Sequence, residues 1–385
     1  MEHDKSNFTS SPGSMLSFFM ESSLLKKIAE IKNNEDLTDE REVIIRAIHN
    51  YYKKTISDYP RPREQFDNEL HETTFDGSVE IEKLEKILAE IKSETFIKKL
   101  PQHQIYNSLK SAGMMHRLHT KILPVKFSLL CLSTMIVEQN NPWIDLNDLK
   151  SYALESAKSF IVKFESSPIR NKFKIESGFP MSKSGDFKTD HDSYLLYARS
   201  SKRFTEEFVG RKLQKRNGIQ IGGACFEMGL MLAKVTNYDE KKNSGKIYVT
   251  LSESGKEFVS YKNSIIDYVY GHLQEKPPSI FTQQERRFYF RKILPEFKFE
   301  NMFVEYLTNH DRIEHTREIK DEFRKRFYKY CNSEFPDRDI SLDENTIRIY
   351  SNTIMNRLME FGVFSKDPKS RSGPYTRMID MDNLF

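Results

Sequence analysis

The chain has 385 residues, of which 60 are Lys or Arg and 56 are Asp or Glu, so its formal net charge is only +4. This length leaves room for two or three domains. The 28 Phe and 18 Tyr residues exclude a disordered chain. Because acids nearly balance bases, a nonspecific polycation is excluded as well, and a nucleic-acid surface would need locally clustered cations.

Cysteine usage and hydropathy indicate the compartment. Three widely spaced cysteines form no metal-ligand pair and suit free thiols in a reducing compartment. The chain contains no apolar stretch long enough to span a bilayer, and its start lacks the order of a signal peptide. We expect a cytoplasmic, nucleoid-associated protein with no membrane partner.

The first hundred residues are predicted to be helical after a disordered tail at 1–14. Apolar residues recur at helical spacing in three stretches between 15 and 100, the last at 79–92, and Pro60 with Pro62 interrupts them. We interpret 15–100 as an N-terminal helical region that could form a homodimer or bind a protein partner.

Residues 101–275 are predicted to form the next domain. The run 125–137 is apolar nearly all round and predicts a buried helix. Asp145 or Asn147 can cap the helix that follows. The stretch 165–192 is rich in Ser, Gly, Pro and Lys and predicts a long polar insertion, either a ligand-binding loop or, as we favour, a simple insertion.

Two helices and a hairpin are predicted to end this domain. Helices are expected at 205–216 and 219–228, separated by the turn signal Asn217-Gly218. Apolar residues alternate at 230–235 and 246–251 and predict two strands with a basic tip between them. A further helix is expected over 252–269.

The order from Phe226 to Val259 resembles the wing and following helix of archaeal and bacterial winged-helix regulators. The likeness lies in Gly229-Leu230, in the strand that begins at Lys246, and in Leu251-Ser-Glu-Ser-Gly-Lys-Glu-Phe. Those families often have Thr where this chain has Ser252. The resemblance implies a winged helix-turn-helix fold, and winged helices mostly bind duplex DNA.

A weaker copy of this order lies in the last predicted domain, 276–385. Helices are expected at 283–294, 301–308, 316–330 and 343–361, followed by a strand, a basic tip at 367–374 and a returning strand. Met359-Glu-Phe-Gly-Val matches Phe226-Glu-Met-Gly-Leu, which favours two modules. The last helix carries Arg348, Asn352 and Asn356 opposite its apolar face, and these residue types suit guanine and adenine edges.

We therefore predict a mainly α protein with small β-hairpins, in which tandem winged helix-turn-helix modules follow an N-terminal helical region. Its partner would be double-stranded DNA and its role transcriptional regulation, with helices 219–228 and 343–361 in major grooves and the basic tips on phosphates. The residues expected to contact DNA are Arg211, Lys212, Lys215, Arg216, Gln220, Lys241, Lys242, Lys246, Arg348, Asn352, Asn356, Lys366, Lys369 and Arg371.

Three other functions stay open: a plasmid- or virus-type replication initiator, a DNA-recognition component of a restriction or defence system, and a protein-docking scaffold built from winged helices. No catalytic residue, metal or cofactor is predicted. Asp76 with Glu90-Ile91-Lys92 has the spacing of a metal-dependent nuclease, but helical periodicity there favours a surface helix. His116-Arg-Leu-His119 could clamp a metal, yet no third ligand follows at a fitting spacing.

Overall fold

In the computed structural model, every residue described below belongs to one compact unit within 72–385. The described residues are 75–89, 104–105, 113–175, 177–181, 191–215, 218–239, 244–338, 340–367, 370 and 373–379. The predicted tail, the proposed dimerisation helices before residue 75, and Glu90 to Lys92 of the nuclease-like motif lie outside this range.

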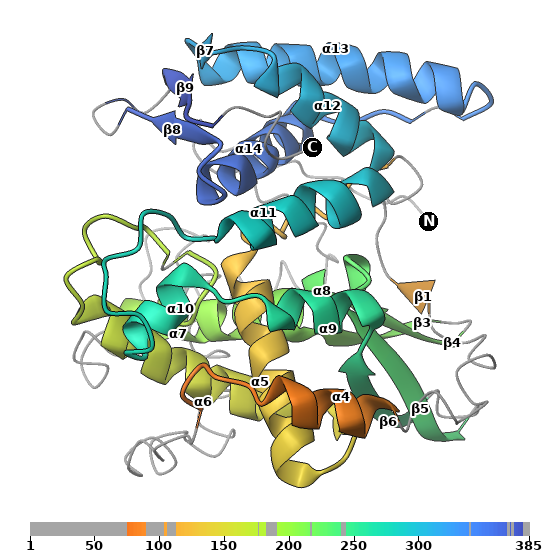
Figure 1. The fold of residues 1–385 in the computed structure, drawn as a ribbon. Coiled ribbons are helices and arrows are strands. Elements are labelled where there is room, and N and C mark those ends of the chain that lie inside the picture. Colours follow the sequence, from red (N-terminus) through yellow and green to blue (C-terminus); the bar gives the residue numbers. More distant parts are fainter. Residues whose placement is uncertain are drawn as a thin grey trace, which may run out of the picture. The chain divides into compact units, whose positions relative to one another are not determined.

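The described part is mainly helical with three small sheets, which confirms the predicted class at this level (Figure 1). Its α-helices are α4 (Ile81–Ala89), α5 (Leu123–Gln139), α6 (Leu146–Glu165), α7 (His191–Arg203), α8 (Ala224–Glu227), α9 (Glu253–Ser260), α10 (Ser264–Val269), α11 (Gln283–Phe288), α12 (Lys298–Thr308), α13 (Thr316–Glu334) and α14 (Glu344–Glu360). Two π-helical segments, η4 (Phe204–Val209) and η5 (Tyr289–Ile293), and a 3-10 turn, η6 (Leu294–Glu296), continue neighbouring helices. The strands are β1 (Gln104–Ile105), β2 (Ile144–Asp145), β3 (Arg211–Lys215), β4 (Gly218–Gly222), β5 (Met231–Asp239), β6 (Ser244–Leu251), β7 (Arg312–Ile313), β8 (Phe364–Lys366) and β9 (Tyr375–Arg377).

Helix α5 is buried on nearly all sides, as its uniformly apolar sequence predicted. Lys126 is buried with it. Its Nζ donates to the Tyr261 carbonyl oxygen at 2.6 Å, beyond the end of α9, and lies 3.6 Å from the Glu285 carboxylate of α11. The cation thus satisfies carbonyl groups at a helix end and a buried acid at once. Burial lowers the pKa of Lys126 and raises that of Glu285.

The first sheet, β2-β6-β5, belongs to a group of elements that occur along the chain in the order α5, β2, α6, α7, β5, β6. Strand β6 lies in the middle, antiparallel to both β2 and β5, so that the first strand pairs with the last. The alternation of Ile247, Val249 and Leu251 places these side chains in the core. Between α7 and β5 the chain inserts the hairpin β3–β4 and the short helix α8, with β1 parallel to β4.

The same order recurs as α12, β7, α13, α14, β8, β9. Here β9 lies in the middle, antiparallel to β7 and β8, with Ile313 opposite Tyr375 and Ser365 opposite Thr376. Again the first strand pairs with the last, although β7 has only two residues. The described residues therefore contain one topology twice.

Several predicted elements are confirmed. Residues 81–89 are helical within the predicted 79–92, and the hairpin strands at 231–239 and 244–251 contain those expected from alternation. The side chain of Asp145 accepts from the Asn147 amide at 2.8 Å at the start of α6. Asp343 accepts from the Thr346 amide at 2.8 Å at the start of α14. The first is the N-cap contact that was predicted, and the second is a contact of the same kind.

Two predicted helices around the Asn217-Gly218 turn are wrong over most of their length. Of the predicted helix 205–216, only residues 205–209 are helical, within η4. Residues 211–215 and 218–222 pair as antiparallel strands, so the turn signal belongs to a hairpin. Only 224–227 is helical within the predicted helix 219–228. Gly223 has φ +122, and a Cβ there would lie 2.8 Å from the Gly210 Cα, so this close backbone approach requires glycine. The predicted helix 252–269 is likewise two helices, and Asn263 caps the second.

Candidate nucleic-acid interface

Helix α14 leaves one stripe of its surface unburied. A helix turns by about 100° per residue, and on this basis the stripe occupies a sector of about 100° around the helix axis. Between residues 347 and 360, the side chains on the remaining faces of the helix are buried. We define the α14 stripe as Asn345, Arg348, Ile349, Asn352, Asn356 and Met359. The structure therefore brings the three predicted base-contacting residues onto one face. Arg348 is exposed, and its Nη2 donates to the Asn345 Oδ1 at 2.6 Å.

The hairpin β8–β9 follows α14 and carries Lys366. This side chain is half-buried, with its Nζ 5.6 Å from the centre of the Tyr375 ring. Lys369 and Arg371, predicted at the tip of this hairpin, lie outside the described residues.

The two hairpins of the first module carry the other predicted cations. Lys246 is exposed on β6. The Lys212 Nζ donates to the Gly245 carbonyl oxygen at 3.2 Å, which joins β3 to the start of β6. Lys215 ends β3. Arg216, Lys241 and Lys242 fall outside the described residues.

Two residues that were predicted to contact DNA from helices lie on strands instead. Arg211 is half-buried on β3, and its Nη1 donates to the Glu207 carboxylate at 3.0 Å. Gln220 is half-buried on strand β4, not on a helix that enters a groove. The prediction that 219–228 is a recognition helix is therefore wrong, because its only helical part is the fully buried α8.

Helix α7 exposes a basic group at its C-terminal end. Arg199 and Lys202 are exposed, and the exposed Arg203 donates to the Thr120 Oγ1 at 3.1 Å. These residues precede the predicted helix 205–216 in the sequence, and the structure places them on a separate helix.

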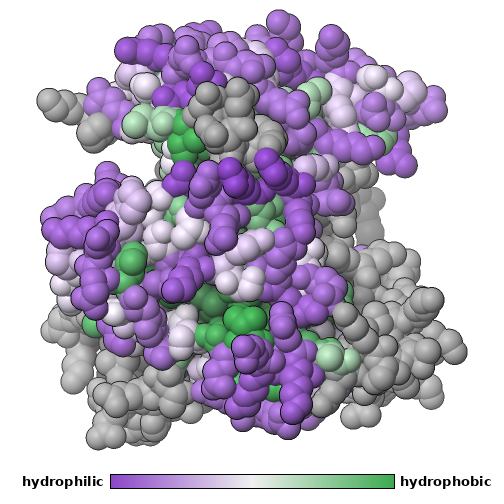
Figure 2. Space-filling model, viewed as in Figure 1, coloured by the Kyte–Doolittle hydropathy of each residue, from purple (hydrophilic) through white to green (hydrophobic). Residues whose placement is uncertain are grey.

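The basic residues of α13 are mostly paired with acids. Lys320 and Arg324 both contact Glu344, and Arg326 contacts Glu322 at 3.2 Å. Hydrophilic residues dominate the upper surface in Figure 2, where Figure 1 shows α13. This helix is therefore a solvated surface on which most cations are already paired.

A buried polar network, which the sequence did not reveal, joins the two repeated topologies. We call residues 113–123 the junction segment. Glu360 of α14 accepts from the Ile122 and Leu123 amides at 2.6 and 3.2 Å, and so caps α5 from another element. The Arg357 Nη1 donates to the His119 carbonyl oxygen at 2.5 Å, and its Nη2 pairs with Glu300 of α12.

The junction segment also contacts the first module through its histidines. The His116 amide donates to a Glu227 oxygen of α8 at 2.7 Å, and the His119 Nδ1 lies 2.6 Å from the other. Burial lowers the pKa of His116 to about 4. Burial also raises the pKa of Glu360. The only sequence signal for this network is the presence of charged residues among the apolar positions of α12 and α14.

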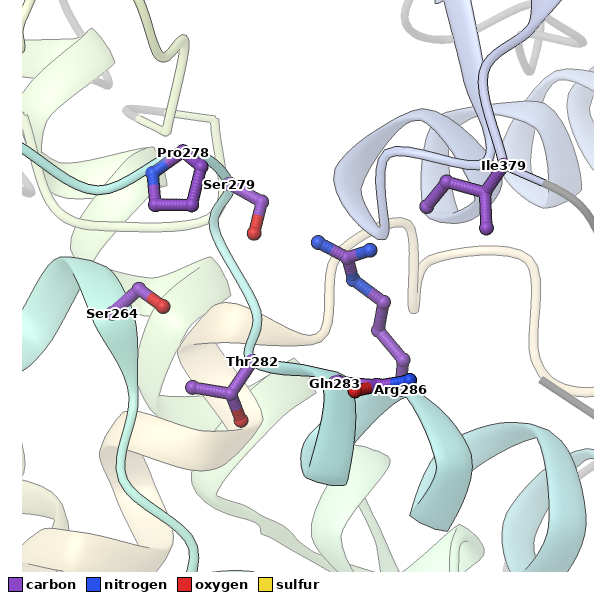
Figure 3. A pocket seen from close by; sticks show the side chains of 7 residues that line it. All are labelled: Ser264, Pro278, Ser279, Thr282, Gln283, Arg286 and Ile379. Atoms are coloured by element: carbon purple, nitrogen blue, oxygen red, sulfur yellow. The ribbon is translucent and has the colours of Figure 1, made fainter. Parts of the chain in front are cut away.

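A pocket of about 630 Å³ lies between the start of α10, the start of α11 and Ile379 (Figure 3). Hydroxyl groups of Ser264, Ser279 and Thr282 line it. The Arg286 side chain extends into it, and its Nη2 donates to the Phe281 carbonyl oxygen at 3.1 Å. None of the predicted DNA contacts lines this pocket.

Among the described residues, no helix is both long and apolar enough to cross a membrane. Comparisons of the chain with protein-family models, with curated proteins and with solved structures each found no match.

Proposed function

We propose that the two repeated topologies are winged-helix modules and that the chain binds double-stranded DNA. The observation that carries this proposal is the sheet order. Each module contains, in this order, a helix, a short strand, two helices and a hairpin, and the short strand pairs with the last strand of the hairpin. In the first module the segment from η4 to α8 is inserted between the second of the two helices, α7, and the hairpin. Two occurrences in one chain support a module that was duplicated.

In the second module, α14 immediately precedes the hairpin and is the proposed recognition helix. Its stripe presents the exposed Arg348 and the half-buried Asn352 and Asn356. Arginine suits the O6 and N7 acceptors of guanine, and asparagine suits the N6 and N7 edge of adenine. Lys366 and the tip cations Lys369 and Arg371 would contact the backbone beside that groove.

In the first module, the exposed cations on α7 and β6 favour binding to DNA phosphates without contacts to bases. Arg199, Lys202 and Lys246 are exposed there, and Lys241 and Lys242 lie between β5 and β6 in the sequence. The first module would thus supply affinity and the second sequence specificity.

Transcriptional regulation is the role we propose. A replication initiator is the second candidate, and the buried network favours it. Charged residues that are 1–4 % exposed, among them Glu227, Glu300 and Arg357, link both modules through the junction segment. One chain would therefore hold two DNA-binding surfaces at a fixed separation. Transcription from a promoter with the selected site tests the first role, and replication of a plasmid that carries it tests the second.

A salt-dependent binding titration of the full chain tests DNA binding itself. We expect affinity for duplexes to fall steeply as salt rises, with a preference for selected over random sequence. The variant Lys241→Ala/Lys242→Ala/Lys369→Ala/Arg371→Ala should flatten the salt slope by about 0.9 for each phosphate that the protein no longer neutralises. Absence of binding at low salt would overturn the proposal and favour a protein-docking scaffold.

A further inference from the structure

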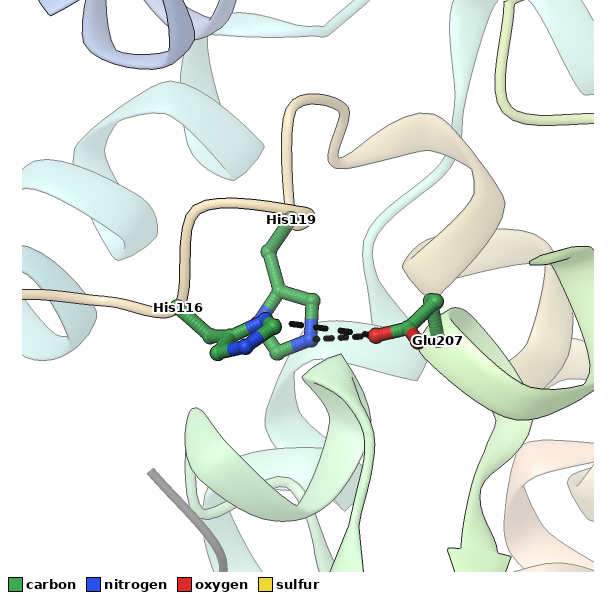
Figure 4. A group of neighbouring side chains, drawn as sticks. All are labelled: His116, His119 and Glu207. Atoms are coloured by element: carbon green, nitrogen blue, oxygen red, sulfur yellow. Dashed lines mark ion pairs between the residues drawn. The ribbon is translucent and has the colours of Figure 1, made fainter. Parts of the chain in front are cut away.

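Three side chains from two distant parts of the sequence converge below the junction segment (Figure 4). His116 and His119 come from that segment, and Glu207 comes from the π-helical turn η4. The His116 Nδ1 lies 3.9 Å from the Glu207 Oε2, and the His119 Nε2 lies 4.0 Å from the same oxygen. One ligand atom from each residue lies within 4.8 Å of the others, and all three residues are largely buried.

The His119 ring is held by a second carboxylate. Its Nδ1 lies 2.6 Å from the Glu227 Oε2, and both side chains are at most 2 % exposed. The other ring nitrogen, Nε2, is the one that faces Glu207, at 4.0 Å from its Oε2. A carboxylate that contacts the far nitrogen of an imidazole is the usual support of a metal-binding histidine, because it fixes both tautomer and ring orientation.

The two carboxylate oxygens of Glu207 differ in their contacts, because only one of them accepts a hydrogen bond. Its Oε1 accepts from the Arg211 guanidinium at 3.0 Å. Its Oε2 is buried and has no hydrogen-bond partner among the described residues. A buried, unpartnered carboxylate oxygen is costly. This oxygen is the one that faces both imidazoles (Figure 4).

We propose that His116, His119 and Glu207 bind one divalent transition-metal ion. Two imidazole nitrogens and one carboxylate oxygen are a ligand set that zinc accepts, and the His-x-x-His spacing comes from a single turn of chain. Neighbouring ligands of a tetrahedral zinc lie ~3.3 Å apart, so the ion would draw each imidazole nitrogen about 0.6–0.7 Å closer to the Glu207 oxygen than the 3.9 and 4.0 Å separations.

The site would fasten the junction segment to the first module. Thr353 and Arg357 of α14 already donate to the carbonyl oxygens of Arg117 and His119. A metal on the histidine side chains would hold the same residues to η4 from the opposite side. The metal would therefore stabilise the arrangement of the two modules, and this role does not depend on whether they bind DNA.

Zinc titration of the full chain, stripped with a chelator and then dialysed, tests the site. We expect one zinc ion per chain in competition with a chromophoric chelator, a rise in Tm on zinc addition, and visible cobalt bands typical of low coordination when Co²⁺ replaces it. Absence of stoichiometric zinc and of the cobalt bands from a folded wild-type chain would overturn the proposal.

Variants locate the ion. Glu207→Gln and His116→Gln should each weaken zinc binding by more than about 100-fold, and Glu227→Gln by about 10- to 100-fold, since it supports a ligand without contacting the metal. His310→Gln is the matched control, because the His310 side chain is exposed and contacts the carbonyl oxygen and the ring of Tyr306, away from the proposed ligands. Wild-type zinc affinity in Glu207→Gln would overturn the assignment. If a variant fails to fold, the wild-type titration and cobalt spectrum still decide.

Discussion

Arg357→Met probes the buried contact between α14, α12 and the junction segment. The Arg357 side chain is 2 % exposed, pairs with Glu300 and donates to the His119 carbonyl oxygen. Methionine fills a similar volume, but it leaves the buried Glu300 carboxylate without its cation. Because removal of one partner of a buried ion pair costs about 3–5 kcal/mol, we expect the free energy of unfolding to fall by that amount.

Guanidinium unfolding of the full chain, followed by far-UV circular dichroism, measures this loss. The double variant Arg357→Met/Glu300→Gln removes both charges. In the wild-type protein the Met115 amide donates to the Glu300 carboxylate at 3.3 Å, and the glutamine oxygen of the double variant can still accept this hydrogen bond. It should lose less than the two single variants together, by at least about 1.5 kcal/mol. Arg317→Met is the control, because its exposed pair with Asp321 contributes below about 0.5 kcal/mol. A loss under about 1 kcal/mol in Arg357→Met, or strict additivity, would refute the buried-pair reasoning.

Three further predictions concern stability. Glu360→Ala leaves the Ile122 and Leu123 amides unsatisfied and should cost about 2–4 kcal/mol in denaturant unfolding, more than Glu360→Gln, which keeps an acceptor; equal costs would contradict the cap. Gly255→Ala places a Cβ 2.0 Å from the Leu230 carbonyl oxygen. This substitution should therefore lower Tm, although Ala is more favourable than Gly within a helix by ~1 kcal/mol. An unchanged Tm would contradict this close contact. Burial lowers the folded pKa of His116 from 6.5 to about 4, so the unfolded chain binds more protons in that window. Stability in a chelator should therefore fall as pH drops from 6.5, by at most about 3 kcal/mol, and His116→Gln should flatten this slope relative to wild type.

The sequence predicted best where one local signal decided the structure. Alternation at Ile247, Val249 and Leu251 defined a strand, and Asp343 marked the start of α14. It failed around Asn217-Gly218, where the spacing of Phe208 and Leu213 imitated a helix although Gly210 intervenes. Gly222-Gly223 was the visible warning, because the chain there requires a close approach to Gly210.

The junction network was out of reach of sequence reasoning, because its members are separated by up to 238 residues. Glu360 caps a helix that begins at Leu123, and Glu207 supplies the third ligand that His116 and His119 lack locally. No local pattern encodes such contacts. Charged residues such as Arg357 within an apolar helix face indicate burial of a charge without naming its partner.

Sequence discrimination by the α14 stripe is the central claim. The measurement is the affinity of the full chain and of Arg348→Ala/Asn352→Ala/Asn356→Ala for a selected and a random duplex at one salt concentration. Because each base contact contributes about 1–3 kcal/mol, we predict a loss of at least about 100-fold on the selected duplex and only a few-fold on the random one. Arg317→Ala/Lys325→Ala on α13 should leave both affinities nearly unchanged. Equal losses on both duplexes, or none, would contradict base reading by α14.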